Sequence, residues 1–392
     1  MAVQSALSAR RGSFRVMLAT TLIVGVSGGA HAARIDFEIG ASVLHSDNIG
    51  LDSSNAVSDT VLSPQLRFKI EQAGSAWRIN ARGDLQYLDY RDNTFDDQFR
   101  GAFSGQARWT MLPERLEFTF EDYLSRQPVD TLAAFNPNNE QQTNVFVTGP
   151  SLFARFGERT RGQLDLRYTN SYAEENKAFD SDRYNGALRL VRELTPSKRL
   201  SGNLEATRVN FDLDTPNSDY KRYDGYINYA SRLRAGNIGF DVGYTRLELE
   251  DGRGSASSPL ARGNIDWRVS PRSTLSADLS YQFSDAAQDL ALNDVGPDTP
   301  IIGDTGNPQI PVAPQVFRER RLELGYQFAG QRLNVQVRPY YQRIHYVDTL
   351  TSDQSDRGGL FQLDYKLRAR WVLSFRAVRE DRDYDDLSRT DR

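Results

Sequence analysis

Apolar and polar residues alternate with a period of two along most of the chain. In the segment 275–284 (LSADLSYQFS) the odd-numbered residues are apolar or aromatic, and the even-numbered residues are polar or charged. The segments 77–87 and 361–370 alternate in the same way. Successive side chains of a strand point to opposite faces, so each segment predicts a strand with one apolar and one polar face.

The length of these segments separates two kinds of β protein. They run for 10 to 16 residues, whereas strands in soluble proteins have about 5–6 residues. A tilted strand of about 9–11 residues crosses a bilayer. The pattern therefore predicts an all-β fold, a transmembrane antiparallel up-and-down β-barrel, in preference to a soluble sandwich.

The connections between the segments alternate between short and long. Short connections such as 73–74, 112–114 and 195–197 carry the Gly or Pro of tight turns. Long ones such as 46–57 and 286–314 are rich in Asp and Asn. Bacterial barrels place short turns in the periplasm and long loops outside. We interpret 17 segments as strands: 34–45, 58–72, 75–91, 97–111, 114–125, 142–156, 159–174, 181–194, 197–212, 219–233, 236–250, 258–269, 271–285, 315–328, 330–348, 356–370 and 372–383.

The first residues have the layout of a secretory signal peptide. Arg10, Arg11 and Arg15 precede an apolar stretch at 16–26, and the sequence Ala-His-Ala at 30–32 provides a cleavage site. We expect residues 1–32 to be removed and residues 33–392 to form one barrel in the outer membrane of a Gram-negative bacterium.

The last residues depart from the usual end of a barrel. Bacterial single-chain barrels have an even number of strands, about 16–18 for a chain of this kind, and 17 is odd. Residues 387–392 (LSRTDR) lack an alternating final strand with a terminal aromatic residue. We expect one more descending strand, so that the chain as given leaves a gap between its first and last strands.

Composition removes several classes of function. The chain has 48 basic and 52 acidic residues, a net charge of −4 and no cysteine. Disulfide frameworks and thiol chemistry are excluded, and no basic patch for nucleic acid is visible. The 26% of charged residues is compatible with a barrel, because only alternate residues face lipid.

Catalytic and metal-binding patterns are not found. The histidines are His31, His45 and His345, and none stands in a hydrolase, phosphate-binding or zinc motif. The acidic loop 286–314 lacks the carboxylate spacing of a calcium loop. We predict neither an enzyme nor a bound cofactor. The loop either folds inward as a constriction or stays outside as a cap.

Aromatic residues on the apolar positions gather near strand ends, as in the girdles at membrane interfaces: Tyr87, Trp109, Trp267, Tyr281, Phe283, Tyr326, Phe328, Tyr365 and Trp371. The polar positions carry both signs of charge. This pattern favours cross-strand ion pairs that hold the wall together over a selective charged constriction. The candidate lumen-lining residues are Arg78, Arg82, Asp84, Arg108, Arg167, Arg262, Asp266, Arg268, Asp278, Asp364, Lys366 and Arg368.

Four stretches resemble a known group of barrels: 40–52 (GASVLHSDNIGLD), 87–92 (YLDYRD), 112–118 (LPERLEF) and 122–127 (DYLSRQ). They are similar to outer-membrane proteins associated with exopolysaccharide gene clusters and the exosortase/PEP-CTERM system. The resemblance implies a non-catalytic role in exopolysaccharide export or assembly.

Three functions are therefore considered, and the third of them, a barrel enzyme or adhesin, is supported only by the long acidic loops. The first is exopolysaccharide export, and its implied partners are outer-membrane lipid, the barrel assembly machinery and polysaccharide or exopolysaccharide export proteins. Sugar rings stack on aromatic faces, and Tyr226, Tyr340 and Tyr346 stand on polar positions where they could serve. The alternative is a general or substrate-selective diffusion porin, which a charged lumen favours.

Overall fold

The computed structural model describes residues 33–50, 55–129, 139–213, 219–250, 254–288, 315–347, 352–368, 371–385 and 389–391. The predicted signal peptide lies outside them. No helix among the described residues is long and apolar enough to cross a membrane. The strands are β1 (Arg34–Ser46), β2 (Asp59–Ala73), β3 (Trp77–Tyr90), β4 (Gln98–Leu112), β5 (Leu116–Pro128), β6 (Glu140–Arg155), β7 (Thr160–Ala173), β8 (Ser181–Thr195), β9 (Lys198–Phe211), β10 (Tyr220–Leu233), β11 (Gly236–Leu249), β12 (Ser255–Ser270), β13 (Ser273–Ser284), β14 (Phe317–Ala329), β15 (Leu333–Tyr346), β16 (Gln354–Arg368), β17 (Trp371–Tyr384) and β18 (Arg389–Asp391), with a short 3-10 helix η2 (Lys177–Phe179) before β8.

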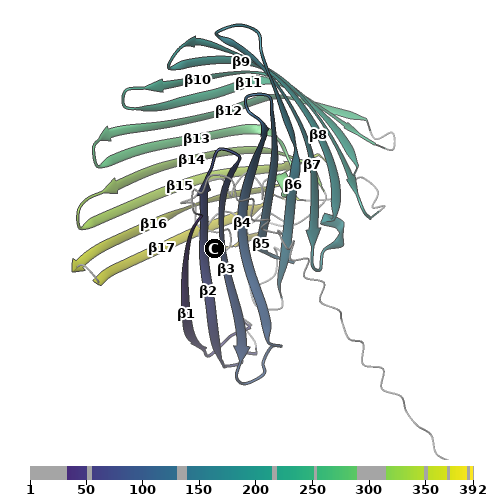
Figure 1. Ribbon diagram of the computed structural model, residues 1–392. Helices are drawn as coiled ribbons and strands as arrows, with labels where there is room; N and C mark the ends of the chain where they lie inside the picture. Colours follow the sequence, from purple (N-terminus) through teal and green to yellow (C-terminus); the bar gives the residue numbers. More distant parts are fainter. Residues whose placement is uncertain are drawn as a thin grey trace, which may run out of the picture.

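The strands form one curved antiparallel sheet in which each strand pairs with its neighbours in sequence (Figure 1). Strands β1 to β17 have 12 to 16 residues each and coincide with the 17 predicted segments. The predicted all-β, up-and-down antiparallel fold is confirmed. Its short and long connections alternate as expected, so all short turns lie at one end of the sheet.

The register keeps each kind of side chain on one face. Between β12 and β13, Arg262 lies opposite Ser280, whereas Gly263 lies opposite Leu279. Directly opposed residues share a face of the sheet, so the apolar face is continuous from strand to strand. Its large side chains are exposed, for example Leu279 at 51% and Ile227 at 58%.

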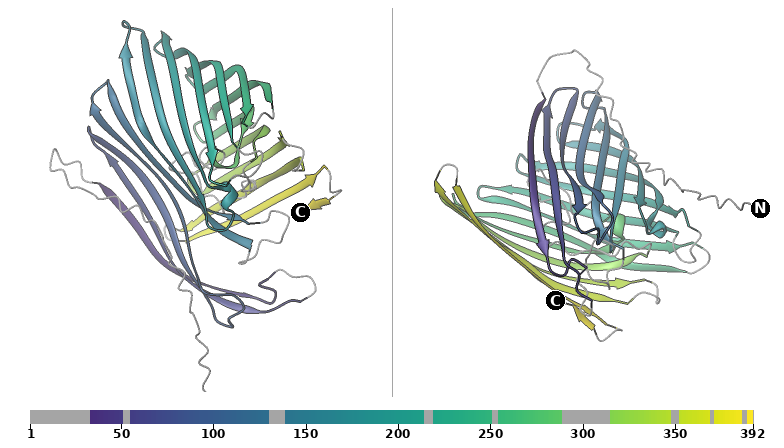
Figure 2. Two further views of the ribbon diagram at one scale, coloured as in Figure 1. Left: turned by 90° about the vertical axis from the view of Figure 1, so that its right-hand side faces the viewer. Right: turned by 90° about the horizontal axis from the view of Figure 1, so that it is seen from below.

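The sheet is curved (Figure 2), and the polar face is its inner, concave side. Ala286 and Ala287, just after β13, pack in one cluster with Tyr123 of β5 and with Phe317 and Ile344 of β14 and β15. A single short segment reaches these distant strands only from inside the curve. The exposed apolar face therefore points outward, where it suits lipid.

Aromatic residues mark the two borders of this outer face. Trp77 and Trp109 stack at the short-turn end, with ring centroids 5.4 Å apart. Tyr87 stands ten residues farther along β3, which is about 33 Å along a strand and about 25 Å of height at the usual tilt. That is the height of the apolar band of an outer-membrane barrel. The chain forms such a wall in the outer membrane.

One predicted girdle residue is misplaced. Phe283 is 2% exposed and packs in a cluster with Val209, Leu247 and Val316, so the prediction that it faces lipid is wrong. Strand β13 ends at Ser284 and the following residues turn inward. The last residues of β13 bend inward together with the segment after them, so the ring of Phe283 is enclosed by the interior cluster.

The first and last long strands form two separate edges. Within the described residues, β1 pairs only with β2, and β17 pairs with β16 and with the short β18. The predicted gap between the first and last long strands is thus present. Both strands run toward the long-loop end, and β18 pairs antiparallel with the end of β17. The expectation of a complete final strand stays a prediction.

Candidate functional site

Most of the predicted lumen-lining residues stand on inner-face positions. The pairing register places there Arg78, Arg82 and Asp84 of β3, Arg108 of β4, Arg167 of β7, Arg262, Asp266 and Arg268 of β12, Asp278 of β13, and Asp364 and Lys366 of β16. Arg368 follows a shift in register and lies opposite Trp371 of β17, so the register does not place it on the inner face. The predicted residues are spread over the wall and do not converge on one point. Their role in contacting a solute stays a prediction.

Several of these residues form ion pairs between strands. Arg67 pairs with Asp84 at 2.9 Å and Arg78 with Glu117 at 3.1 Å. The Arg side chains of both pairs are about half exposed, and exposed pairs contribute about 0–1 kcal/mol each. The pattern supports the interpretation of cross-strand pairs that fix the wall.

A longer polar network crosses β7 to β10 near the middle of the wall. Arg189 lies between Asp165 and Glu205, at 3.9 and 3.7 Å. Tyr226 donates a hydrogen bond to Glu205 at 2.5 Å. Charges of opposite sign alternate along this network, so the wall offers no uninterrupted row of one sign there.

The network continues onto β11 and β12 through one arginine. The guanidinium of Arg262 lies 4.8 Å from the ring centre of Tyr226 and pairs with Asp241 at 2.9 Å. Asp241 also accepts a hydrogen bond from Asn228 at 2.6 Å. Sequence reasoning singled out Arg262 and Tyr226 separately but not the contact between them, because the alternation says nothing about register.

The long loop after β13 enters the interior at once. Asp285 is 1% exposed. Arg183 of β8 donates to both of its carboxylate oxygens at 2.6 Å, and the Tyr220 hydroxyl of β10 also donates to it. The backbone N–H groups of Ala287 and Gln288 donate to the same carboxylate at 3.0 and 3.1 Å. Of the two predicted arrangements, residues 285–288 adopt the inward one. The rest of the loop, to residue 314, lies outside the described residues.

A second arginine ties the same segment to the wall. Arg222 of β10 donates to the side-chain oxygen of Gln288 at 2.6 Å and to the backbone carbonyl of Phe283 at 3.2 Å. It also pairs with Asp224 at 3.0 Å. The segment that follows β13 is therefore held to the wall by two buried arginines, and we call residues 285–288 the inner anchor.

Electrostatics favour the ionised form of the anchor carboxylate. Burial by itself raises the pKa of Asp285. The positive charge and hydrogen bonds of Arg183, together with the hydrogen bond from Tyr220, outweigh that effect and hold the pKa below its usual value. Asp285 is therefore a charged group at neutral pH.

Two apolar clusters surround the anchor at the long-loop end. One consists of Tyr123, Val145, Ala173, Phe179, Ala286, Ala287, Phe317, Ile344 and Tyr346, and the other of Val209, Phe211, Tyr220, Leu247, Phe283 and Val316. Sequence reasoning missed them. The available signal was the apolar residue on inner-face positions such as Val209 and Leu247, close to the long loops.

The remaining candidate for chemistry is His345, near the outer end of β15. Its Nδ1 atom is hydrogen-bonded to the Asp353 carboxylate, and the side chain is 56% exposed. In the described part of the chain, no group of three or more His, Asp or Glu side chains has the geometry of a metal site. His345 is therefore an exposed residue at the long-loop end of the wall.

No family model matches the sequence, and neither does any curated protein. Among solved structures, the chain is similar to a BenF-like porin of Pseudomonas fluorescens Pf-5, with a TM-score of 0.45, 9% identity, and coverage of 93% of this chain and 96% of that one. OccK2 (OpdF) of Pseudomonas aeruginosa, solved in complex with glucuronate, gives a TM-score of 0.42, 14% identity and coverage of 91% and 95%. The FrpB iron transporter of Neisseria meningitidis (F5-1 variant) gives a TM-score of 0.45 and 10% identity over 90% of this chain. This chain spans 63% of the length of that transporter. Likeness of this degree identifies no solute.

Proposed function

We propose that the protein is a diffusion channel for small hydrophilic solutes across the outer membrane. The polar, ion-paired inner face of a wall with 17 long strands carries the proposal. Barrels of about 16–18 strands enclose an aqueous channel, whereas those of 8 strands are filled by side chains. A polar face of this extent needs water or solute against it.

The arrangement of charge and of the inner anchor supports two properties of this channel. Opposite charges alternate through Asp165, Arg189 and Glu205, which favours weak selectivity between cations and anions. The anchor with Asp285 occupies part of the bore at the long-loop end. We expect it to limit the size of solutes that pass.

Polysaccharide export stays the second candidate, and the resemblance of four sequence stretches supports it. The inner tyrosines do not strengthen it. Tyr346 is 3% exposed and packs edge-on against Phe317, Tyr340 is 8% exposed, and Arg262 covers the ring of Tyr226. Sugar stacking requires free aromatic faces, so these contacts favour the diffusion channel.

Conductance and solute flux test the proposal. The folded full-length chain is inserted into planar bilayers and into liposomes that are challenged with sugars of increasing size. We expect stable single-channel steps, a reversal potential near zero in a salt gradient, and swelling that falls off with sugar size. Folded, inserted protein that passes neither ions nor the smallest sugar would overturn the channel. Loss of secreted polysaccharide from a deletion strain whose protein shows no conductance would favour export.

A further inference from the structure

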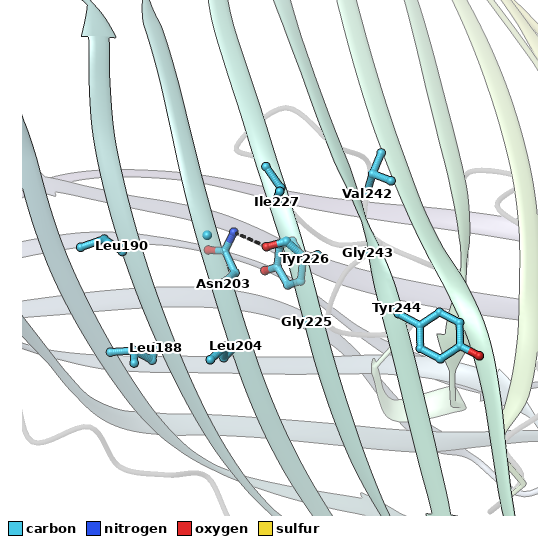
Figure 3. A pocket seen from close by; sticks show the side chains of 11 residues that line it. Leu188, Leu190, Asn203, Leu204, Gly225, Tyr226, Ile227, Val242, Gly243 and Tyr244 are labelled. Atoms are coloured by element: carbon cyan, nitrogen blue, oxygen red, sulfur yellow. Dashed lines mark hydrogen bonds between the residues drawn. The ribbon is translucent and has the colours of Figure 1, made fainter.

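The outer, lipid-facing surface has an apolar groove across β8 to β11. It has a volume of about 530 Å³ and is lined by Leu188, Leu190, Gly202, Asn203, Leu204, Gly225, Tyr226, Ile227, Val242, Gly243 and Tyr244. Figure 3 shows Leu188 and Leu190 along one side and Val242 and Tyr244 along the other. The groove opens on the outside of the wall, and Asn203, Tyr226 and Gly243 of its lining stand on inner-face positions of the same strands.

Two glycines create the groove. Gly202 lies between Leu190 and Ile227, and Gly225 lies between Leu204 and Tyr244 in the register. Each glycine lacks a side chain in a row of large apolar residues, and this leaves open space on the outer face.

Neither glycine is required by the backbone. A Cβ atom on Gly202 would meet nothing within 4 Å, and one on Gly225 would meet only Leu204, at 3.6 Å. Neither residue is among the described glycines with positive φ. Glycine weakens a strand interior and often marks a close approach of another group, so the open space is the physical effect of these two residues.

Charged residues stand above the groove on the same outer face, toward the long-loop end. Arg208 and Lys221 are directly opposed on β9 and β10. Glu250 pairs with Lys221 at 3.0 Å and with Arg208 at 3.6 Å. Arg246 of β11 pairs with Glu248 at 2.9 Å. We call these five residues the rim patch. It has three positive and two negative charges, so it carries a net positive charge.

The spacing of patch and groove places both within one leaflet. Lys221 is four residues above Gly225 on β10, and Arg208 is four residues above Leu204 on β9. Four residues of strand are about 13 Å, or about 10 Å of height at the usual tilt, and one leaflet of hydrocarbon is about 15 Å thick. A head group at the patch would therefore place its acyl chain in the groove.

We infer that the groove holds an acyl chain of a lipopolysaccharide molecule of the outer leaflet, whose lipid A phosphates bind the rim patch. The long-loop end faces outward, which places the patch in the leaflet that contains this lipid. Phosphates complement Arg208, Lys221 and Arg246, and Glu248 and Glu250 are hard oxygen ligands for the divalent cations that bridge phosphates. Lipid tails gain no hydrophobic energy from the groove within a bilayer, so the phosphate contacts supply the selectivity.

Native mass spectrometry of the folded full-length protein, titrated with diphosphoryl lipid A or with phosphatidylglycerol, tests the inference. We expect one retained lipid A molecule and weaker retention of phosphatidylglycerol. Lys221→Gln should weaken binding of lipid A about fivefold. Gly202→Leu should weaken it by at least as much, because the new side chain occupies the groove and its Cβ atom meets nothing within 4 Å.

Two matched controls make the outcome decisive. Gly263→Leu adds the same side chain to an outer-face glycine beyond the groove, where the nearest atom to a Cβ lies at 3.8 Å, and it should leave binding unchanged. A paired change of Arg192 and Lys198 to Gln removes outer-face cations from the short-turn end and should also have no effect. Equal binding by Gly202→Leu and the unmodified chain would overturn the inference. Sensitivity to Arg192 and Lys198 but not to Lys221 would also overturn it, in favour of an inner-leaflet phospholipid.

Discussion

The buried carboxylate of the inner anchor offers the sharpest test of how the long loop is held. Asp285 is 1% exposed and receives hydrogen bonds from Arg183, Tyr220 and two backbone N–H groups. Asp285→Asn removes the negative charge and keeps the volume of the side chain. Arg183, whose side chain is 9% exposed, is then a buried cation that lacks this partner.

The structure sets the size of the effect. Removal of one partner from a buried ion pair costs about 3–5 kcal/mol, because the remaining charge stays buried. This corresponds to a shift of between about a hundredfold and a few thousandfold in the equilibrium between the anchored and released segment. Amide hydrogen exchange, read by mass spectrometry on peptides that cover 285–288, should accelerate by a comparable factor.

The control is an ion pair of the same chemistry in an exposed place. Arg34 and Asp36 on β1 pair at 2.8 Å, with side chains 72% and 51% exposed, so Asp36→Asn should leave exchange at 285–288 unchanged. A double change of Arg183 and Asp285 to Leu should recover part of the lost protection, because an apolar pair leaves no buried charge. Unchanged exchange in Asp285→Asn would show that Asp285 does not hold the segment.

Three further predictions concern the anchor, the wall and one close approach. Since the folded pKa of Asp285 is below its usual value, the stabilisation of the anchored segment by this carboxylate should be complete above about pH 4 and lost only as pH falls through the folded pKa. Amide hydrogen exchange at 285–288, corrected for intrinsic rates, should therefore be constant from about pH 5 to 8. Leu279→Arg on the outer face should cost about 2–4 kcal/mol of unfolding free energy in bilayers, and Ser280→Arg on the inner face little; equal costs would show that the faces are reversed. Gly243→Val should lower the unfolding free energy by about 1–3 kcal/mol, because a Cβ there would lie 2.2 Å from the Gly225 carbonyl oxygen; an unchanged unfolding free energy would contradict that geometry.

The alternation of residues predicted the strands because the two faces meet different surroundings. Lipid on one side and polar groups on the other impose a period of two on every strand that separates them. The face on which a residue such as Leu279 or Asp278 lies can therefore be predicted from its own polarity. The same contrast identified residues on inner-face positions, such as Arg78, Arg262 and Asp364.

The interior contacts could not be predicted in this way. Asp285 and Arg183 are separated by 102 positions, and no local pattern links them. Phe283 follows the alternation and yet is enclosed, because the path of the loop decides its surroundings. The partners of Arg262 depend on strand register, which turn geometry sets.

The pairing pattern described above also bears on how a wall of this kind can change in width. Each described strand pairs only with strands next to it in sequence, so the wall is a row of local hairpins. Gain or loss of one hairpin leaves every other pairing intact, and the diameter of a barrel grows roughly linearly with strand number. The width of the wall is therefore set by the number of hairpins, and it can change without rerouting the chain.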